Sequence, residues 1–243
     1  MLKKAKGVSL LRVAGWVLIV KKRILYHYPL SPFSRKVRIA LREKELSFEP
    51  KIENFWERRR EFLIMNPAAQ VPVLIEAGGD LFSDSTAVCE YLEEKYPERN
   101  LLGDTAEERA EVRRLAGWFN NKFYYEVTKY VLDEKMFKYL RGEGEPCTVS
   151  LRAAESNVLA HLDYIGYLCQ QRTWLAGEKF SMADIAAASH ISVLDYLGYI
   201  PWRHNEQVKE WYALVKSRPS FRPLLKDRVA GFQPPRHYND LDF

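Results

Sequence analysis

The clearest indication of the fold is the stretch Ser31-Pro32-Phe33-Ser34-Arg35-Lys36-Val37-Arg38, which follows the run Ile24-Leu25-Tyr26-His27. The run predicts a short strand, the proline a turn, and the residues after it an amphipathic helix. A helix N-terminus favours a thiolate through its free N–H groups and its dipole, so redox proteins place Cys-x-x-Cys pairs at such turns. This chain has Ser31 and Ser34 at that spacing. Because a serine hydroxyl stays protonated at neutral pH, the turn indicates binding rather than turnover.

Residues 23–99 alternate short strands with helices, which predicts a small α/β layer. The expected strands are 24–27, 48–52, 71–75 and 81–82, and the expected helices are 35–44 and 85–96. Either Asp84 or Ser83 can cap the second helix, and Pro97 ends it.

The second half of the chain contains no convincing strand and predicts an all-helical domain over 104–230. A capping box can open its first helix at Thr105, with Glu108 three residues later. Asp104 with Glu107 is the alternative box. The expected helices run from this box to about 140 and over 149–171, 206–217 and 220–227, with a further one beginning near 181.

The composition is that of a globular protein, with 47% hydrophobic and 28% charged residues among 243. A net charge of +5 without a dense basic stripe argues against nucleic-acid binding. The three cysteines, Cys89, Cys147 and Cys169, lie far apart and lack metal-ligand spacing. They predict a reducing cytoplasm and no metal site.

Residues 1–22 are assigned to an N-terminal extension outside the fold. The segment Val8–Val20 is largely apolar but too short to cross a bilayer as a helix, so no stable membrane insertion is expected. Lys21-Lys22-Arg23 follows it in place of a signal-peptide cleavage site. A start codon placed too early is the alternative explanation.

Four landmarks in order resemble the cytosolic glutathione S-transferase superfamily. They are the stretch 31–38, the segment 66–74 with Val71-Pro72, the segment 84–87 with Asp84-Ser85, and a capping box at 180–184. The resemblance covers about residues 23–228. It implies the glutathione S-transferase fold, an α/β N-terminal thioredoxin-like domain followed by an all-α C-terminal helical domain.

The resemblance also implies the position of a glutathione pocket. The residues at the matching positions are Ser31, Ser34, Val71, Pro72, Asp84 and Ser85. A cis Val71–Pro72 bond would offer the Val71 backbone to the ligand, and a helix N-terminus at Ser85 would bind a carboxylate. Purely structural roles are the alternative, since the fold needs the proline and Ser85 can serve as a helix cap.

Ser31 falls where serine-type transferases keep the hydroxyl that stabilises the glutathione thiolate. Pro32 and Phe33 depart from the Ser-Cys pattern of one serine class. No catalytic residue is therefore expected, with Ser31 as a vestigial candidate. No cofactor is expected beyond residual glutathione binding.

Residues 231–243 extend beyond the last predicted helix as a C-terminal tail. Pro234-Pro235 forces an extended start, and the tip mixes aromatic, apolar and acidic residues, as short docking motifs do. The contacts expected for a partner are Tyr238, Asp240, Leu241, Asp242 and Phe243, with Trp56 as a second surface. A frayed tail is the alternative. Removing 238–243 is expected to abolish partner binding and leave the fold intact.

With the run Asn54-Phe55-Trp56-Glu57-Arg58-Arg59-Arg60, the tail resembles the glutathione-transferase-like division proteins of alphaproteobacteria. That resemblance implies a homodimeric cytoplasmic adaptor at the division site, with the FtsZ polymer and other division proteins as partners. Such an adaptor would link the division ring to constriction and cell-wall synthesis. Two alternatives remain, namely a glutathione transferase that uses Ser31 and a stringent-starvation type of RNA-polymerase adaptor.

Overall fold

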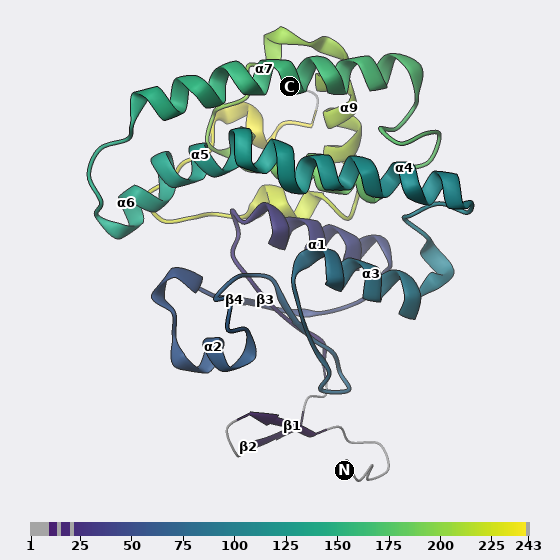
Figure 1. Cartoon of the computed structure of the whole chain (residues 1–243), viewed down its shortest axis with the longest axis vertical. Coiled ribbons are helices and arrows are strands. Elements are labelled where there is room, and N and C mark those ends of the chain that lie inside the picture. The colour runs from purple at the N-terminus through teal and green to yellow at the C-terminus, as the bar shows by residue number, and fades with distance from the viewer. Residues whose placement is uncertain (1–9, 14–15, 20–21, 242–243) are drawn as a thin grey trace. The chain divides into compact units, whose positions relative to one another are not determined.

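The computed structural model describes residues 10–13, 16–19 and 22–241 and divides into two compact units, Met1–Arg99 and Asn100–Phe243 (Figure 1). The first unit combines a sheet with helices, and the second is built from helices. This is the division of secondary structure that the sequence predicts.

The first unit contains a four-stranded sheet in the order β4-β3-β5-β6. The central strand β3 (Ile24–His27) pairs parallel with β4 (Glu49–Ile52) and antiparallel with β5 (Val73–Ile75), which pairs antiparallel with β6 (Leu81–Ser83). Hydrophobic residues of β3 and β5 supply its core, since Leu25 and Leu74 are fully buried.

Helices α1 (Pro32–Glu43) and α3 (Ser85–Lys95) pack against each other, and the short α2 (Arg60–Met65) contacts β3 through Phe62 and Tyr26, with ring centroids 6.2 Å apart. Two 3₁₀ turns complete the unit, η1 (Phe55–Glu57) and η2 (Pro97–Arg99).

Part of the predicted extension forms a separate hairpin. Strands β1 (Leu10–Val13) and β2 (Trp16–Ile19) pair antiparallel as a two-stranded sheet of their own. The remainder of residues 1–21 lies outside the described residues.

The second unit begins with consecutive helical segments that correspond to the single long helix predicted from the first capping box. They are α4 (Ala106–Gly117), the π-helical η3 (Trp118–Thr128), α5 (Lys129–Leu132), the π-helical η4 (Asp133–Phe137) and α6 (Lys138–Arg141). The box itself uses Thr105 and Glu108 rather than Asp104 and Glu107, with Glu108 N–H donating to Thr105 Oγ1 over 3.1 Å.

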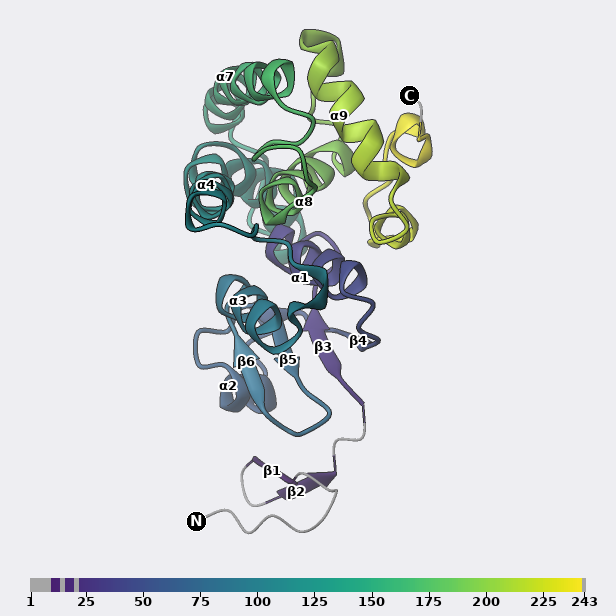
Figure 2. The same ribbon diagram turned by 90° about the vertical axis from the view of Figure 1, so that its right-hand side faces the viewer.

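Three further helices follow, α7 (Thr148–Gln171), α8 (Met182–Tyr196) and α9 (Glu206–Ser217). Every residue of α8 is buried, and Figure 2 shows this helix among α4, α7 and α9. A helix that is mostly apolar on all sides belongs at the centre of a helical domain.

The remaining elements are 3₁₀ turns, with η5 (Trp202–His204) between α8 and α9, and η6 (Arg222–Lys226) and η7 (Arg236–Asn239) after α9. The helix predicted over 220–227 is therefore shorter than expected. Pro223 has no N–H with which to continue an α-helical ladder, which accounts for the short turn.

Candidate functional site

Strand pairing gathers the predicted pocket residues at one end of the sheet. Tyr26 of β3 lies opposite Val73 of β5, and Val73 lies opposite Ser83 of β6. Because these neighbours are antiparallel, the segment after β3, the segment before β5 and the segment after β6 all meet at the same end. Those segments carry Ser31, Ser34, Val71, Pro72, Asp84 and Ser85.

Ser31 and Ser34 close the turn that opens α1. Ser31 is the N-cap, and its Oγ accepts a hydrogen bond from Ser34 N–H over 3.2 Å. Ser34 Oγ accepts from Tyr28 N–H over 3.3 Å. Ser31 is 8% exposed and Ser34 is fully buried, so only Ser31 offers any surface to a ligand. Its hydroxyl proton can still be donated, because the cap uses only an oxygen lone pair.

The turn is reinforced by two buried cations that the sequence pattern did not mark. Arg35 is fully buried and donates from Nε to Pro29 O over 2.7 Å. Lys36 is 2% exposed and donates from Nζ to Thr86 Oγ1 over 3.3 Å, which ties α1 to α3. Burial lowers the pKa of Lys36, and burial raises the pKa of nearby Cys89 to about 11, so Cys89 stays an inert thiol.

The Val71–Pro72 bond is cis, as the resemblance implies, and both residues are buried. The loop before it is held by Asn66, whose Nδ2 donates to Gln70 O over 2.8 Å. This segment therefore has the cis backbone that the resemblance implies directly before β5, while its role toward glutathione stays a prediction.

Asp84, rather than Ser83, caps α3. Its Oδ1 accepts from Thr86 N–H over 2.7 Å and from Ala87 N–H over 3.0 Å. Its φ of 71° lies in the left-handed region, which side chains other than glycine rarely adopt. The helix N-terminus thus already holds a carboxylate from its own chain, and an incoming carboxylate must share it with Asp84.

Trp56 lies half-buried in η1, where its ring packs edge-on against Tyr28 at 4.9 Å and Phe55 at 5.3 Å. The loop is fixed by Arg59, whose Nη2 lies 2.5 Å from Oε2 of Glu53. The Glu53 side chain is fully buried, and this hydrogen bond and charge raise the pKa of Arg59. The Trp56 ring is thus packed against two neighbouring rings and remains partly exposed.

The structure changes the role predicted for Tyr238. Its side chain is fully buried, its OH donates to Leu224 O over 3.3 Å, and its ring packs edge-on against Tyr196 at 5.2 Å. A buried ring anchors the tail and cannot also be the exposed contact for a partner.

The other tail residues fall into two groups. Asp240 is exposed and Leu241 is half-buried. Asp242 and Phe243 lie outside the described residues.

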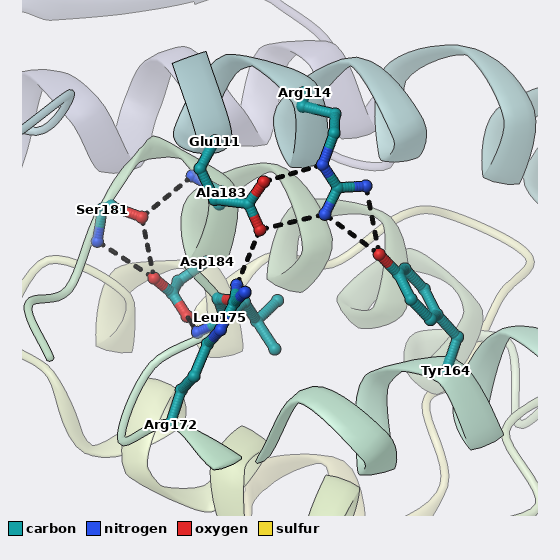
Figure 3. A network of polar contacts seen from close by, with 8 residues as sticks. All are labelled: Glu111, Arg114, Tyr164, Arg172, Leu175, Ser181, Ala183 and Asp184. Carbon is teal, nitrogen blue, oxygen red and sulfur yellow. Dashed lines mark hydrogen bonds and ion pairs between the residues drawn. The ribbon is translucent and has the colours of Figure 1, made fainter. Parts of the chain in front are cut away.

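The helical unit contains a polar network that Figure 3 shows in detail. Glu111 of α4 accepts from Arg114 Nε over 2.7 Å and from Arg172 Nη1 over 2.7 Å, and Arg114 also donates to Tyr164 OH. Hydrogen bonds from Arg114 and Arg172 lower the pKa of Glu111 to about 2. The network joins α4, α7 and the turn after α7, so its role is structural.

Asp184 forms the second capping box that the sequence predicts. It accepts from Leu175 N–H, Ser181 N–H and Ser181 Oγ–H at 2.9 to 3.1 Å (Figure 3). It also accepts from Trp211 Nε1–H over 3.0 Å. Burial raises the pKa of Asp184 against the opposing effect of these bonds. The box links the start of α8 to α9 and to the preceding turn.

Within residues 10–13, 16–19 and 22–241, no group of His, Cys, Asp and Glu side chains has an arrangement that could bind a metal ion. The described helices also include none with the length and apolar character of a membrane span.

Comparisons with known proteins agree with both units. The chain matches the family models "Glutathione S-transferase, N-terminal domain" over residues 25–100 and "Glutathione S-transferase, C-terminal domain" over residues 148–214. It is 46% identical to FtsZ-localized protein A of Caulobacter vibrioides over 225 residues, which covers 91% of this chain and 99% of that protein.

Two solved structures are similar over 91% of this chain and 100% of their own. A glutathione S-transferase from Rhodospirillum rubrum F11 has 54% identity and a TM-score of 0.90. FzlA from C. crescentus has 46% identity and a TM-score of 0.89.

Proposed function

Because the chain belongs to the glutathione S-transferase superfamily and, within it, to the family of FtsZ-localized protein A, we propose that it binds the division polymer FtsZ as a non-catalytic adaptor. It acts in the cytoplasm at the division site and links ring architecture to constriction and cell-wall synthesis. It does so as a homodimer. A dimer has two copies of each contact surface and can bridge polymers through avidity.

The observation that carries this proposal is the 46% identity with FtsZ-localized protein A. The alignment of 225 residues is longer than either compact unit, so it extends over both. The likeness therefore concerns the whole architecture rather than the α/β unit alone.

The geometry at the end of the sheet supports an adaptor that does not catalyse glutathione transfer. Ser34 is fully buried, Ser31 accepts the capping hydrogen bond of α1, and Asp84 occupies the first-turn N–H groups of α3. The side chains of Ser31, Ser34 and Asp84, which the resemblance assigns to the glutathione pocket, thus each accept a hydrogen bond that closes this part of the fold.

The proposed FtsZ contacts are Trp56 and the end of the tail, Asp240 to Phe243. Trp56 is a rigid, partly exposed aromatic beside the exposed cations Arg58 and Arg60. Aromatic residues and arginines dominate binding free energy at protein interfaces, and clustered cations favour acidic partners.

A glutathione S-transferase that uses Ser31 is the second candidate. It is favoured by the 54% identity with the R. rubrum glutathione S-transferase and by Ser31, which is 8% exposed where Ser34 is fully buried. In that case the hydroxyl proton of Ser31 would stabilise the glutathione thiolate during attack on a small electrophile. Turnover that disappears in Ser31→Ala would support this candidate.

Co-sedimentation with GTP-assembled FtsZ tests the adaptor proposal. The full chain should pellet with the polymer, and Trp56→Ala should weaken pelleting by at least about tenfold, as expected for loss of an interface anchor worth roughly 2 kcal/mol. The matched control is Tyr167→Ala, which removes a 55% exposed aromatic on α7 and should pellet like the parent chain. Absence of pelleting by the full chain would contradict the proposal.

A further inference from the structure

The C-terminal tail is fastened to the helical unit well before its end. Tyr196 of α8 uses its OH to donate to Phe232 O over 2.9 Å and to accept from Val229 N–H over 3.1 Å. In Figure 2 the yellow tail lies beside α9. The buried Tyr238 ring then fixes the middle of the tail against Tyr196.

Lys216 holds the next part of the tail. It lies in the last turn of α9, is fully buried, and donates from Nζ to His237 O over 3.2 Å and to Asp240 O. These carbonyls lie at the end of η7, where the partial negative charge of the backbone oxygens favours a cation, and His237 O also accepts from Asp240 N–H over 3.0 Å. A buried ammonium needs such acceptors, so the tail and Lys216 stabilise each other.

Asp195 supplies a second point of attachment. Its side chain is fully buried, and its Oδ1 accepts from Trp202 Nε1–H over 2.9 Å and lies 2.9 Å from Nε2 of His237. Its Oδ2 accepts from Tyr212 OH over 3.3 Å. Trp202 and Tyr212 thus fix both oxygens of the carboxylate, and Oδ1 can accept a further hydrogen bond from the tail.

We propose that Lys216 and Asp195 are positioning residues that set the direction in which the chain leaves η7. This inference rests on the proposed function, in which the residues after Asn239 contact FtsZ. Lys216 and Asp195 themselves are fully buried and would touch no partner. They preorganise the docking segment, so its ordering cost is met during folding and not during binding.

The two polar attachments can be removed without removing Tyr238, which anchors the tail to the helical unit. Tyr238 remains a strong anchor when either polar attachment is removed, so the tail stays associated and only its exit is loosened. His237 is the better point for substitution on the second attachment, because its side chain is 37% exposed while Asp195 lies deep among Trp202 and Tyr212.

The test compares Lys216→Met, His237→Ala and His237→Gln in the full chain. The glutamine amide can donate to Asp195 in place of the imidazole, so it should rescue the alanine variant. Two readouts are hydrogen exchange at the Asp240 amide, which bonds to His237 O over 3.0 Å, and the concentration for half-maximal pelleting with GTP-assembled FtsZ.

We expect Lys216→Met and His237→Ala to speed Asp240 exchange and to raise the half-maximal concentration, each by about tenfold, while His237→Gln stays near the parent chain. Thermal unfolding reports separately on the helical unit, and His237→Ala decides the matter if Lys216→Met does not fold. Unchanged pelleting despite faster exchange, or unchanged exchange in both variants, would overturn the positioning roles.

A chain that ends at Asp240 keeps both attachments and removes Leu241, Asp242 and Phe243 from the segment they present. If it pellets as well as the full chain, the tail contact in the proposed function fails, whatever the Lys216 and His237 variants do. If it loses pelleting while Lys216→Met and His237→Ala keep theirs, the tail contact stands and the positioning roles are wrong.

Discussion

Replacement of Asp184 by alanine tests how strongly a single carboxylate organises the helical unit. Asp184 is fully buried at the start of α8 and accepts hydrogen bonds from Leu175 N–H, Ser181 N–H and Trp211 Nε1–H. The Ser181 hydroxyl also donates to it, but that hydroxyl can rotate to another acceptor. Asp184→Ala therefore leaves the buried N–H donors without an acceptor.

The expected cost follows from those donors. Each buried donor left without a partner costs about 1–3 kcal/mol, and costs within one network are not additive. Removing a buried carboxylate also relieves its desolvation, which is the cause of the raised pKa of Asp184. We expect a net loss of about 3–5 kcal/mol, a large part of the roughly 5–15 kcal/mol that holds a typical domain folded.

Thermal unfolding measures the change, and a fall in Tm on the order of 10 °C is expected for a chain of this size. The matched control is Asp163→Ala on α7, where a 62% exposed carboxylate pairs with His204 at 2.7 Å. An exposed pair contributes about 0–1 kcal/mol, so this variant should unfold within a few degrees of the parent. If Asp184→Ala lowered the free energy of unfolding by less than about 1 kcal/mol, the reasoning would be refuted, because one buried N–H group without an acceptor should already cost about that much.

Three further predictions concern the titrating groups and the turn. Burial lowers the pKa of His161 below the 6.5 of the unfolded chain, so the unfolded state binds more protons and the free energy of unfolding falls as the pH drops below 6.5. In denaturant unfolding, His161→Gln should therefore reduce the dependence of this free energy on pH between about pH 7.5 and pH 5.5. The Glu111 carboxylate, with its pKa lowered to about 2, stabilises the fold above pH 4.5 and loses this effect as the pH falls toward 2. Glu111→Gln should cost about 1 kcal/mol at neutral pH, allowing for solvent screening, and an equal loss at pH 2 would speak against the ion pairs. Ser31→Ala removes an N-cap and should cost about 1 kcal/mol in chemical unfolding, but FtsZ pelleting should not change; a folded variant that no longer pellets would count against a purely structural Ser31.

Local signals in the sequence account for much of the fold. The apolar runs at 24–27 and 71–75 are strands or parts of strands, and the boxes at Thr105 and Ser181 begin helices where expected. Such signals depend on residues a few positions apart, so they can be recognised without knowing which distant residues pack against the segment. The cis Val71–Pro72 bond was anticipated only through the family resemblance.

Long-range burial was not predictable in the same way. Periodicity assigns cations to solvent, yet Lys36 and Lys216 bury long apolar stems and satisfy their ammonium groups on partners distant in sequence. Tyr238 likewise becomes a core residue through Tyr196 and Leu224. Removing residues 238–243 would therefore also remove a core ring, so a cut after Asp240 isolates the docking segment better.

The most direct test of the central claim is sedimentation of the unaltered chain with FtsZ, titrated in parallel with GTP and with GDP. The account predicts saturable pelleting that requires GTP-assembled polymer, with no turnover of glutathione with an electrophile by the same preparation. Failure to pellet with assembled FtsZ, together with measurable turnover, would contradict the adaptor and favour the transferase.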